Sequence, residues 1–341
     1  MKANILIGTY TSGGDSRGIY EAELDLGSGA LGGARLAVSQ REPSYLALSQ
    51  DGKRLYAVEE TVPSGRVFSY RLTKDGWVQT GVQPSGGSAP CHVMMDEETN
   101  TLAVANYMNG AVSFYGLDTE GALQSGPQTI VMDGKGVNIR RQECAHAHQC
   151  VKFGDKILVN DLGTDRIRVF HRDAKGCYSE EAPLVYTRPG AGPRHMVMTK
   201  DGVMLYLLCE MENTVYAFRN TGKGFSEEGV YTYLPKDAPQ SSAAAIRLGH
   251  DERYLFASSR GGFSGVALFE LDTKTRLPVL RDVCASGAIP RDILPVGDYL
   301  LCACQDANVV QVMKLDRDQK RLAVTGEMAV PRPVCLVLTN R

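Results

Sequence analysis

The chain has 341 residues, with a formal net charge of -2, 43% hydrophobic residues and 22% charged residues, an ordinary globular composition that supports a large core. Near-neutral charge argues against nucleic acid as the main partner, because binding along a phosphate backbone requires a surplus of Lys and Arg, whereas a small anionic substrate needs only a few local arginines. No stretch is long and apolar enough to span a membrane, and the apolar run at residues 5–7 is too short for a secretory signal, so we expect a soluble protein with no membrane partner.

One unit recurs along the chain with a period of roughly 45–50 residues, the range of propeller blades rather than of helical repeats. Each copy has a small or Pro-containing start, an apolar strand, a turn, a second apolar strand with a polar end, and an alternating strand. Asp51-Gly52 and Asp201-Gly202 are turns of the hairpin type, and no segment shows a sustained helical period. The copies begin at Pro43, Pro90, His146, Pro193, Ala243 and Pro290.

Two fragments at the chain ends complement each other. The segment "PVCLVLTN" from Pro333 has the pattern of a first strand, and "NILIGTYTSGGDSRGIYEAEL" near the N-terminus has the pattern of the strands that follow it. No Pro- or Ser-rich linker divides the chain. We therefore predict an all-β, seven-bladed β-propeller, one domain over residues 1–341, whose ring is closed by N- and C-terminal strands sharing one blade.

Nine cysteines form an odd set without a CxxC pair. Cys302 and Cys304 lie two apart, on the same side of the predicted strand, and most cysteines have apolar neighbours. This pattern predicts buried, reduced thiols rather than disulfides or a zinc site, and hence a cytoplasmic protein.

Polar residues recur at the start of the first strand and at the end of the second strand of each unit. In a propeller blade both positions open onto the same face, because the second strand returns antiparallel to the first. The strand starts carry Cys91, His92, His146, His148, Arg194, His195, Arg291 and Asp292. The strand ends carry Glu59, Glu60, Asn106, Asn160, Asp161, Glu210, Arg260, Gln305 and Asp306. The set indicates a site for a polar ligand, although strand capping and binding of channel waters explain any single residue equally well.

His146 and His148 lie two residues apart, and we expect only one of them to face the channel. No third ligand stands at a recognisable spacing, so no metal is predicted. The Gly-rich insertion at residues 132–143 carries Arg140 and Arg141, and it either covers the channel mouth or is a solvated loop. No redox cofactor motif and no Ser-His-Asp order is evident, so we predict no cofactor.

Several motifs, taken in order, resemble the lactonase family of seven-bladed propellers over essentially the whole chain. They are the opening "ILIGTYT", "VNDLGTDRI", "GAGPRHMVM", "SSR", "PRDILPVGDYLLCACQDANVVQVMKLD" and the closing "PVCLVL". That family includes the propeller type of 6-phosphogluconolactonase, a hydrolase of the pentose phosphate pathway, and the fungal carboxymuconate cyclase. The resemblance implies hydrolysis of a sugar lactone, most of all 6-phospho-D-glucono-1,5-lactone. A cyclase, an enzyme for an unphosphorylated sugar lactone, and a non-catalytic binding propeller remain alternatives.

The resemblance also implies a catalytic set. When the motifs are matched, the functional residues of the cyclase branch correspond to His148, Arg194, Glu210 and Arg260 of this sequence. Glu210 is the candidate base for water and His148 the proton donor, or the two exchange roles, while the arginines stabilise the oxyanion or bind the substrate's phosphate or carboxylate. Residues expected to contact the substrate are Arg291, His195, His92 and Asp161. Here Cys209 and Ser259 replace the family's usual asparagines before Glu210 and Arg260, which changes the immediate neighbours of both side chains.

Overall fold

The computed structural model describes residues 1–339, which contain no helix and form seven four-stranded sheets. Within this range no helix exists that is long and apolar enough to cross a membrane. The chain divides into two compact units, unit 1 with residues Met1–Leu36 and Arg194–Thr339, and unit 2 with Ala37–Pro193. Each unit is described by itself below.

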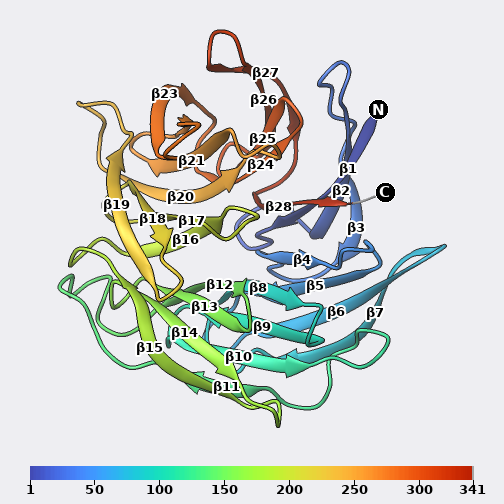
Figure 1. Cartoon of the computed structure of the whole chain (residues 1–341). Helices are drawn as coiled ribbons and strands as arrows, with labels where there is room; N and C mark the ends of the chain where they lie inside the picture. The colour runs from blue at the N-terminus through green and yellow to red at the C-terminus, as the bar shows by residue number, and fades with distance from the viewer. Residues whose placement is uncertain (340–341) are drawn as a thin grey trace. The chain divides into compact units, whose positions relative to one another are not determined.

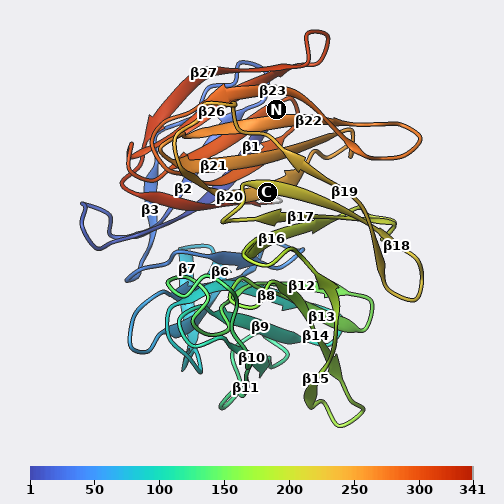
Figure 2. The same cartoon turned by 90° about the vertical axis from the view of Figure 1, so that its left-hand side faces the viewer.

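Unit 2 holds three sheets, each made of strands that follow one another in the chain (Figure 1). The first consists of β4 (Leu46–Leu48), β5 (Arg54–Glu59), β6 (Arg66–Thr73) and β7 (Gly76–Pro84). The second consists of β8 (Pro90–Asp96), β9 (Thr101–Asn106), β10 (Ala111–Gly116) and β11 (Gln128–Val131). The third consists of β12 (Ala147–Phe153), β13 (Lys156–Asp161), β14 (Arg166–Arg172) and β15 (Tyr178–Tyr186), which lie side by side in Figure 2.

Unit 1 holds the other four sheets. Two of them are β16 (Pro193–Met198), β17 (Met204–Cys209), β18 (Thr214–Asn220) and β19 (Phe225–Thr232), then β20 (Ser241–Leu248), β21 (Tyr254–Gly261), β22 (Gly265–Leu271) and β23 (Pro278–Ala285). The third is β24 (Pro290–Val296), β25 (Tyr299–Cys304), β26 (Val309–Asp316) and β27 (Arg321–Ala329). The fourth has the order β28 (Pro333–Thr339), β1 (Lys2–Thr9), β2 (Gly18–Asp25) and β3 (Arg35–Ser39).

The fourth sheet joins the two ends of the chain. β1 pairs antiparallel with β28, with Ile5 opposite Leu338 and Ile7 opposite Leu336. The Leu336 N–H also donates to the buried carboxylate of Asp292, at 2.9 Å, and so fixes β28 to the sheet of β24. The prediction that N- and C-terminal strands share one blade is confirmed.

The second strand of a sheet is largely apolar because both of its faces are covered. All six residues of β17 are buried, and the same is true of β9 and β25. Alternate side chains of β17, Met204, Tyr206 and Leu208, pack in one core cluster with Ala257 and Phe269 of the next sheet. Contacts between sheets of this kind explain the continuous apolar runs that the sequence shows at each repeat.

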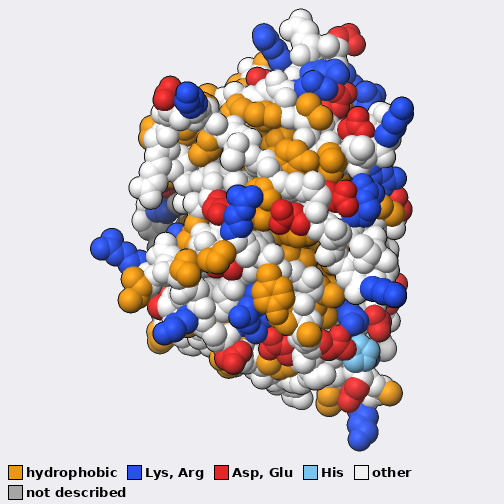
Figure 3. Space-filling view, turned by 60° about the vertical axis from the view of Figure 1, so that its left-hand side comes forward, with side chains coloured by type: hydrophobic (Ala, Val, Ile, Leu, Met, Phe, Trp, Pro, Cys, Tyr) orange, Lys and Arg blue, Asp and Glu red, His pale blue; other side chains and the backbone are white. Residues whose placement is uncertain are grey.

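The cysteines follow the predicted pattern. All nine are free thiols, six of them are buried, and the Sγ atoms of Cys302 and Cys304 lie 3.7 Å apart on one side of β25. On the face drawn in Figure 3, Lys and Arg side chains lie intermixed with Asp and Glu side chains.

Candidate active site

A similar backbone turn recurs near the start of the first strand in several sheets. In several sheets a Pro opens the first strand or closely precedes it, and the residue in front of that Pro has a positive φ, a conformation that L-residues rarely adopt. These residues are Glu42 (45°), Ala89 (52°), Gly192 (71°), Ile289 (57°) and Arg332 (45°). The pairing register shifts near the start of the first strand in four sheets, at Pro90/His92, Ala147/Gln149, Ala243/Ile246 and Pro290/Asp292.

A β-bulge places one extra residue in a strand and redirects its side chain. His148 is the extra residue between Ala147 and Gln149, and Arg291 is the extra residue between Pro290 and Asp292. Two predicted site residues thus lie where the backbone departs from regular pairing. This placement favours a functional role for both residues over a role in strand pairing alone, because bulges are frequent beside active sites.

A cluster of buried charges lies at the strand ends of unit 1. Arg194 is the second residue of β16, Glu210 follows β17 directly, and Arg260 lies near the end of β21. The Glu210 Oε2 atom accepts from Arg194 Nε at 3.0 Å and from Arg260 Nη2 at 3.1 Å. The Glu210 and Arg194 side chains are only 4% and 3% exposed, and that of Arg260 is 15% exposed, so Arg260 is the most accessible of the three.

Arg194 is held from three sides. Besides its contact with Glu210, its Nη1 atom donates to the backbone carbonyl of Ala244, which lies in the bulge of β20. The same Nη1 atom lies 3.3 Å from both ring nitrogens of His195, so the guanidinium covers the imidazole face. This arrangement fixes the Arg194 side chain and makes it a rigid source of positive charge.

Positive charge exceeds negative charge in this cluster. Burial first, and then the charges of Arg194 and Arg291, lower the pKa of Arg260 to about 9. The negative charge of Glu210 raises the pKa of Arg260, but by less than burial and the two arginines lower it. Two guanidinium groups contact the Glu210 carboxylate, and the charge of a third, that of Arg291, acts on Arg260, an arrangement that favours binding of an anion.

Tyr10 and Arg332 extend the cluster, and the sequence analysis missed both. The Arg291 Cζ atom lies 5.1 Å from the centre of the Tyr10 ring and the Arg332 Cζ atom lies 6.0 Å from it. Tyr10 follows β1, which is the second strand of its sheet, so it occupies the same repeat position as Glu210. Aligning the terminal blade with the others would have identified it.

The remaining predicted residues, His148, His92 and Asp161, lie in unit 2. His148 is buried, and the Tyr107 ring meets its ring edge-on with 5.6 Å between centres. His92 accepts the Cys150 N–H at Nδ1, at 3.4 Å, and its ring lies 4.2 Å from that of Tyr45.

Asp161 is fully buried and contacts protein groups. Its Oδ1 atom accepts the backbone N–H groups of His146 at 2.8 Å and Gly163 at 3.0 Å. Its Oδ2 atom accepts from Arg168 Nε at 3.0 Å. The carboxylate therefore holds the backbone that leads into β12 and His148, a positioning role rather than a contact with substrate.

The loop before β12 gathers three side chains of metal-ligating type, Glu143, Cys144 and His146, whose donor atoms lie within 4.8 Å of one another. His146 also stacks on Tyr107, with ring centres 4.5 Å apart. Tyr107 thus contacts both His146 and His148, which lie two residues apart in the chain.

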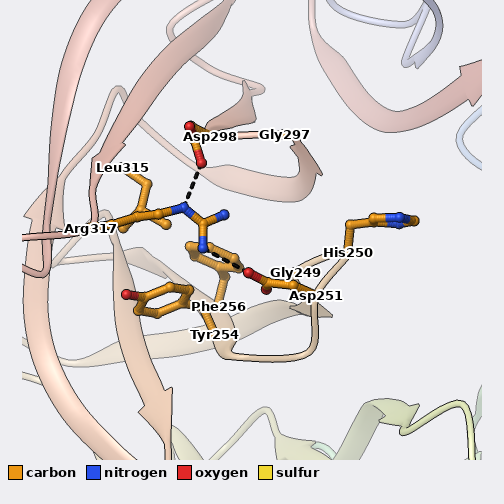
Figure 4. Close-up of a pocket in the computed structure, with 9 residues that line it drawn as sticks. All are labelled: Gly249, His250, Asp251, Tyr254, Phe256, Gly297, Asp298, Leu315 and Arg317. Atoms are coloured by element: carbon orange, nitrogen blue, oxygen red, sulfur yellow. Dashed lines mark hydrogen bonds and ion pairs between the residues drawn. The ribbon is translucent and has the colours of Figure 1, made fainter.

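A pocket of about 170 Å³ lies elsewhere in unit 1, at the hairpin turns after β20 and β24 (Figure 4). Arg317 extends across it and donates to Asp251 at 2.7 Å and to Asp298 at 2.6 Å. Both carboxylates are therefore neutralised within the protein. None of the predicted site residues lines this pocket, which lies at the opposite ends of the strands from Arg194 and Glu210.

Seven four-stranded sheets with charged residues at their strand ends define an all-β propeller, the predicted fold class. A family model described as "Lactonase, 7-bladed beta-propeller" matches residues 4–338. The chain therefore belongs to the lactonase family of seven-bladed β-propellers, and both the predicted family and the predicted fold class are confirmed.

Relatives match over nearly their whole length. The chain is 30% identical to a 6-phosphogluconolactonase of Bacillus subtilis strain 168, with 97% of this chain and 96% of the relative covered. It is 26% identical to a 6-phosphogluconolactonase of Formosa agariphila, with 93% and 94% covered. The solved structure of a periplasmic gluconolactonase from Pseudomonas aeruginosa superposes with a TM-score of 0.93 at 25% identity, with 99% of each chain covered.

Proposed function

We propose that this protein is a lactonase that hydrolyses 6-phospho-D-glucono-1,5-lactone to 6-phosphogluconate, a step of the pentose phosphate pathway. The observation that carries the proposal is the buried carboxylate of Glu210 between Arg194 and Arg260, with Arg291 adding further positive charge. The names of the relatives support the same substrate class. The nine free thiols support a cytoplasmic protein, and we propose that residues 1–341 act as one domain.

Lactone hydrolysis needs an activated water, charge stabilisation at the carbonyl oxygen and a proton for the departing ring oxygen. Water attacks the carbonyl carbon, the bond from this carbon to the ring oxygen breaks, and the ring oxygen leaves as a hydroxyl. We assign the two proton transfers to Glu210 and His148. Arg194, which is held rigidly, stabilises the oxyanion, because charge fixed before the reaction needs no reorganisation during it.

Arg260 and Arg291 are assigned to the substrate's anionic group, with His195 and His92 as supporting residues and Asp161 as the residue that positions the β12 backbone. A guanidinium group presents a planar fork that matches a phosphate or carboxylate. Arg291 is the extra residue of the bulge in β24, and its guanidinium lies beside the Tyr10 ring.

The substrate assignment predicts a preference for the phosphorylated lactone. Arg291→Gln should lower kcat/KM for 6-phosphogluconolactone by about tenfold or more, since a hydrogen bond to a charged group contributes about 1.5–3 kcal/mol. The same variant should leave hydrolysis of unphosphorylated gluconolactone nearly unchanged. Initial rates, corrected for spontaneous hydrolysis, measure both values.

Arg253→Gln is the matched control, because Arg253 has an exposed side chain outside the cluster. Equal rates on the two lactones in the wild type would contradict the phosphate assignment. Activity on a carboxylated muconolactone alone would favour a cyclase, and no turnover of any lactone would favour a binding propeller.

A further inference from the structure

Glu143, Cys144 and His146 form a compact donor set on the loop that leads into β12. The His146 Nε2 atom lies 3.4 Å from Glu143 Oε1 and 4.0 Å from Cys144 Sγ. One imidazole nitrogen, one sulfur and one carboxylate oxygen thus face a common point. None of the three belongs to the residues assigned above to lactone hydrolysis.

The two spacings to His146 Nε2 are close to those of a tetrahedral metal site, and the sulfur and carboxylate oxygen lie within 4.8 Å of each other. Zinc binds nitrogen and oxygen at about 2.0–2.2 Å and sulfur at about 2.3 Å, which separates neighbouring ligand atoms by about 3.4–3.6 Å. The nitrogen–oxygen separation of 3.4 Å already fits, and the nitrogen–sulfur separation of 4.0 Å requires a shift of a few tenths of an ångström. Glu143 is exposed and Cys144 is partly exposed, so both side chains have room for that adjustment.

His146 is oriented as a metal ligand would be. Its Nδ1 atom contacts the Tyr107 backbone oxygen at 2.8 Å and, as the donor, carries the ring proton. The lone pair then resides on Nε2, the atom that faces Glu143 and Cys144. A hydrogen bond from the second ring nitrogen to a carbonyl is the usual support of a ligating histidine.

The surroundings hold this ring in place. His146 is only 2% exposed, its ring stacks on Tyr107, and its backbone N–H donates to Asp161. The buried histidine therefore forms the floor of the site, and the more exposed Glu143 and Cys144 form its open side. The alternative for this geometry is an ion pair between Glu143 and a protonated His146, which would bind no metal.

We propose that Glu143, Cys144 and His146 bind a divalent transition-metal ion of the zinc class, with water in the fourth position. A thiolate and an imidazole select zinc or cobalt over magnesium or calcium, which prefer oxygen ligands. On binding, the Cys144 S–H bond breaks, its electron pair forms the metal–sulfur bond, and the proton leaves to solvent.

Cobalt(II) is the probe that reports the sulfur ligand directly. Full-length protein treated with a chelator should bind one cobalt ion and develop a thiolate-to-cobalt charge-transfer band, and zinc should displace it. Calorimetry with zinc in buffers of different ionisation enthalpy should show proton release. Absence of the charge-transfer band, or zinc binding without proton release, would overturn the proposal.

The variants separate this site from other thiols and histidines. Cys144→Ser should abolish the band and weaken zinc binding by more than about 100-fold. Loss of a group that only hydrogen-bonds to a metal ligand already lowers affinity by up to about 100-fold, and loss of a ligand should cost more. Glu143→Gln should weaken binding without removing the band. Cys177→Ser and His171→Gln, at an exposed cysteine and a part-exposed histidine outside the set, should bind like the wild type.

His146→Gln tests the third ligand, but His146 is buried, so Cys144→Ser and Glu143→Gln decide the outcome if that variant does not fold. Zinc binding that survives Cys144→Ser would contradict the proposal, and so would its loss in Cys177→Ser. These measurements do not depend on lactone turnover, so the metal-site proposal and the proposed function are tested independently of each other.

Discussion

Glu210→Gln is expected to lower the turnover of 6-phosphogluconolactone by about 100-fold or more, because a positioned proton-transfer group typically contributes 10²–10⁴-fold. The substitution preserves the shape of the side chain but removes its charge. It also leaves Arg194 and Arg260 without the carboxylate that both contact. Steady-state kinetics measures the loss in kcat, and far-UV circular dichroism shows whether the sheets remain formed.

Glu212→Gln is the control for this variant. Glu212 lies two residues further along the chain, and its Oε2 atom accepts from the hydroxyls of Thr214 and Tyr216 outside the cluster. Its substitution should leave kcat within a factor of about two, as surface changes rarely exceed 0.5 kcal/mol. Near-wild-type turnover of Glu210→Gln would remove Glu210 from the mechanism.

His148→Ala is expected to lower kcat by a similar factor of about 100 or more, with an altered pH–rate profile. The limb of the pH–rate profile that His148 controls should disappear in the variant. Loss of the acidic limb identifies His148 as the base, and loss of the basic limb identifies it as the proton donor.

His171→Ala controls for the removal of an imidazole, since His171 lies on β14 with a part-exposed side chain. Its pH profile should match that of the wild type. If His148→Ala retained full activity and an unchanged profile, the catalytic assignment of His148 would be wrong, whereas the assignment of Glu210 would be unaffected.

The sequence contains enough information for the fold because the repeat specifies the same packing several times. Each second strand is covered on both faces, so its apolar run, as in β17, is visible without any knowledge of the partners. The pairing of β28 with β1 follows from the same repeat, since the fragment at each end lacks the strands that the other supplies.

The candidate site was predictable only in part. Repeat alignment finds Arg194, Glu210 and Arg260, because strand starts and strand ends are fixed by the blade pattern. It does not reveal what a buried side chain contacts, so Asp161 looked like a ligand residue although its oxygens bind backbone and Arg168. It also missed Glu143 and Cys144, which lie three and two residues before His146, because they belong to a loop outside the repeated strands.

The sheet that joins β1 to β28 has a consequence for how the chain matures. β1 is the first strand of the described residues and its hydrogen-bonding partner β28 is the last, so β1 is synthesised long before the strand that pairs with it. Until then one edge of β1 stays open to pairing with another nascent chain. Deletion of Pro333–Thr339 would make that exposure permanent, so the loss of these seven residues should lead to association between copies rather than to a slightly shorter enzyme.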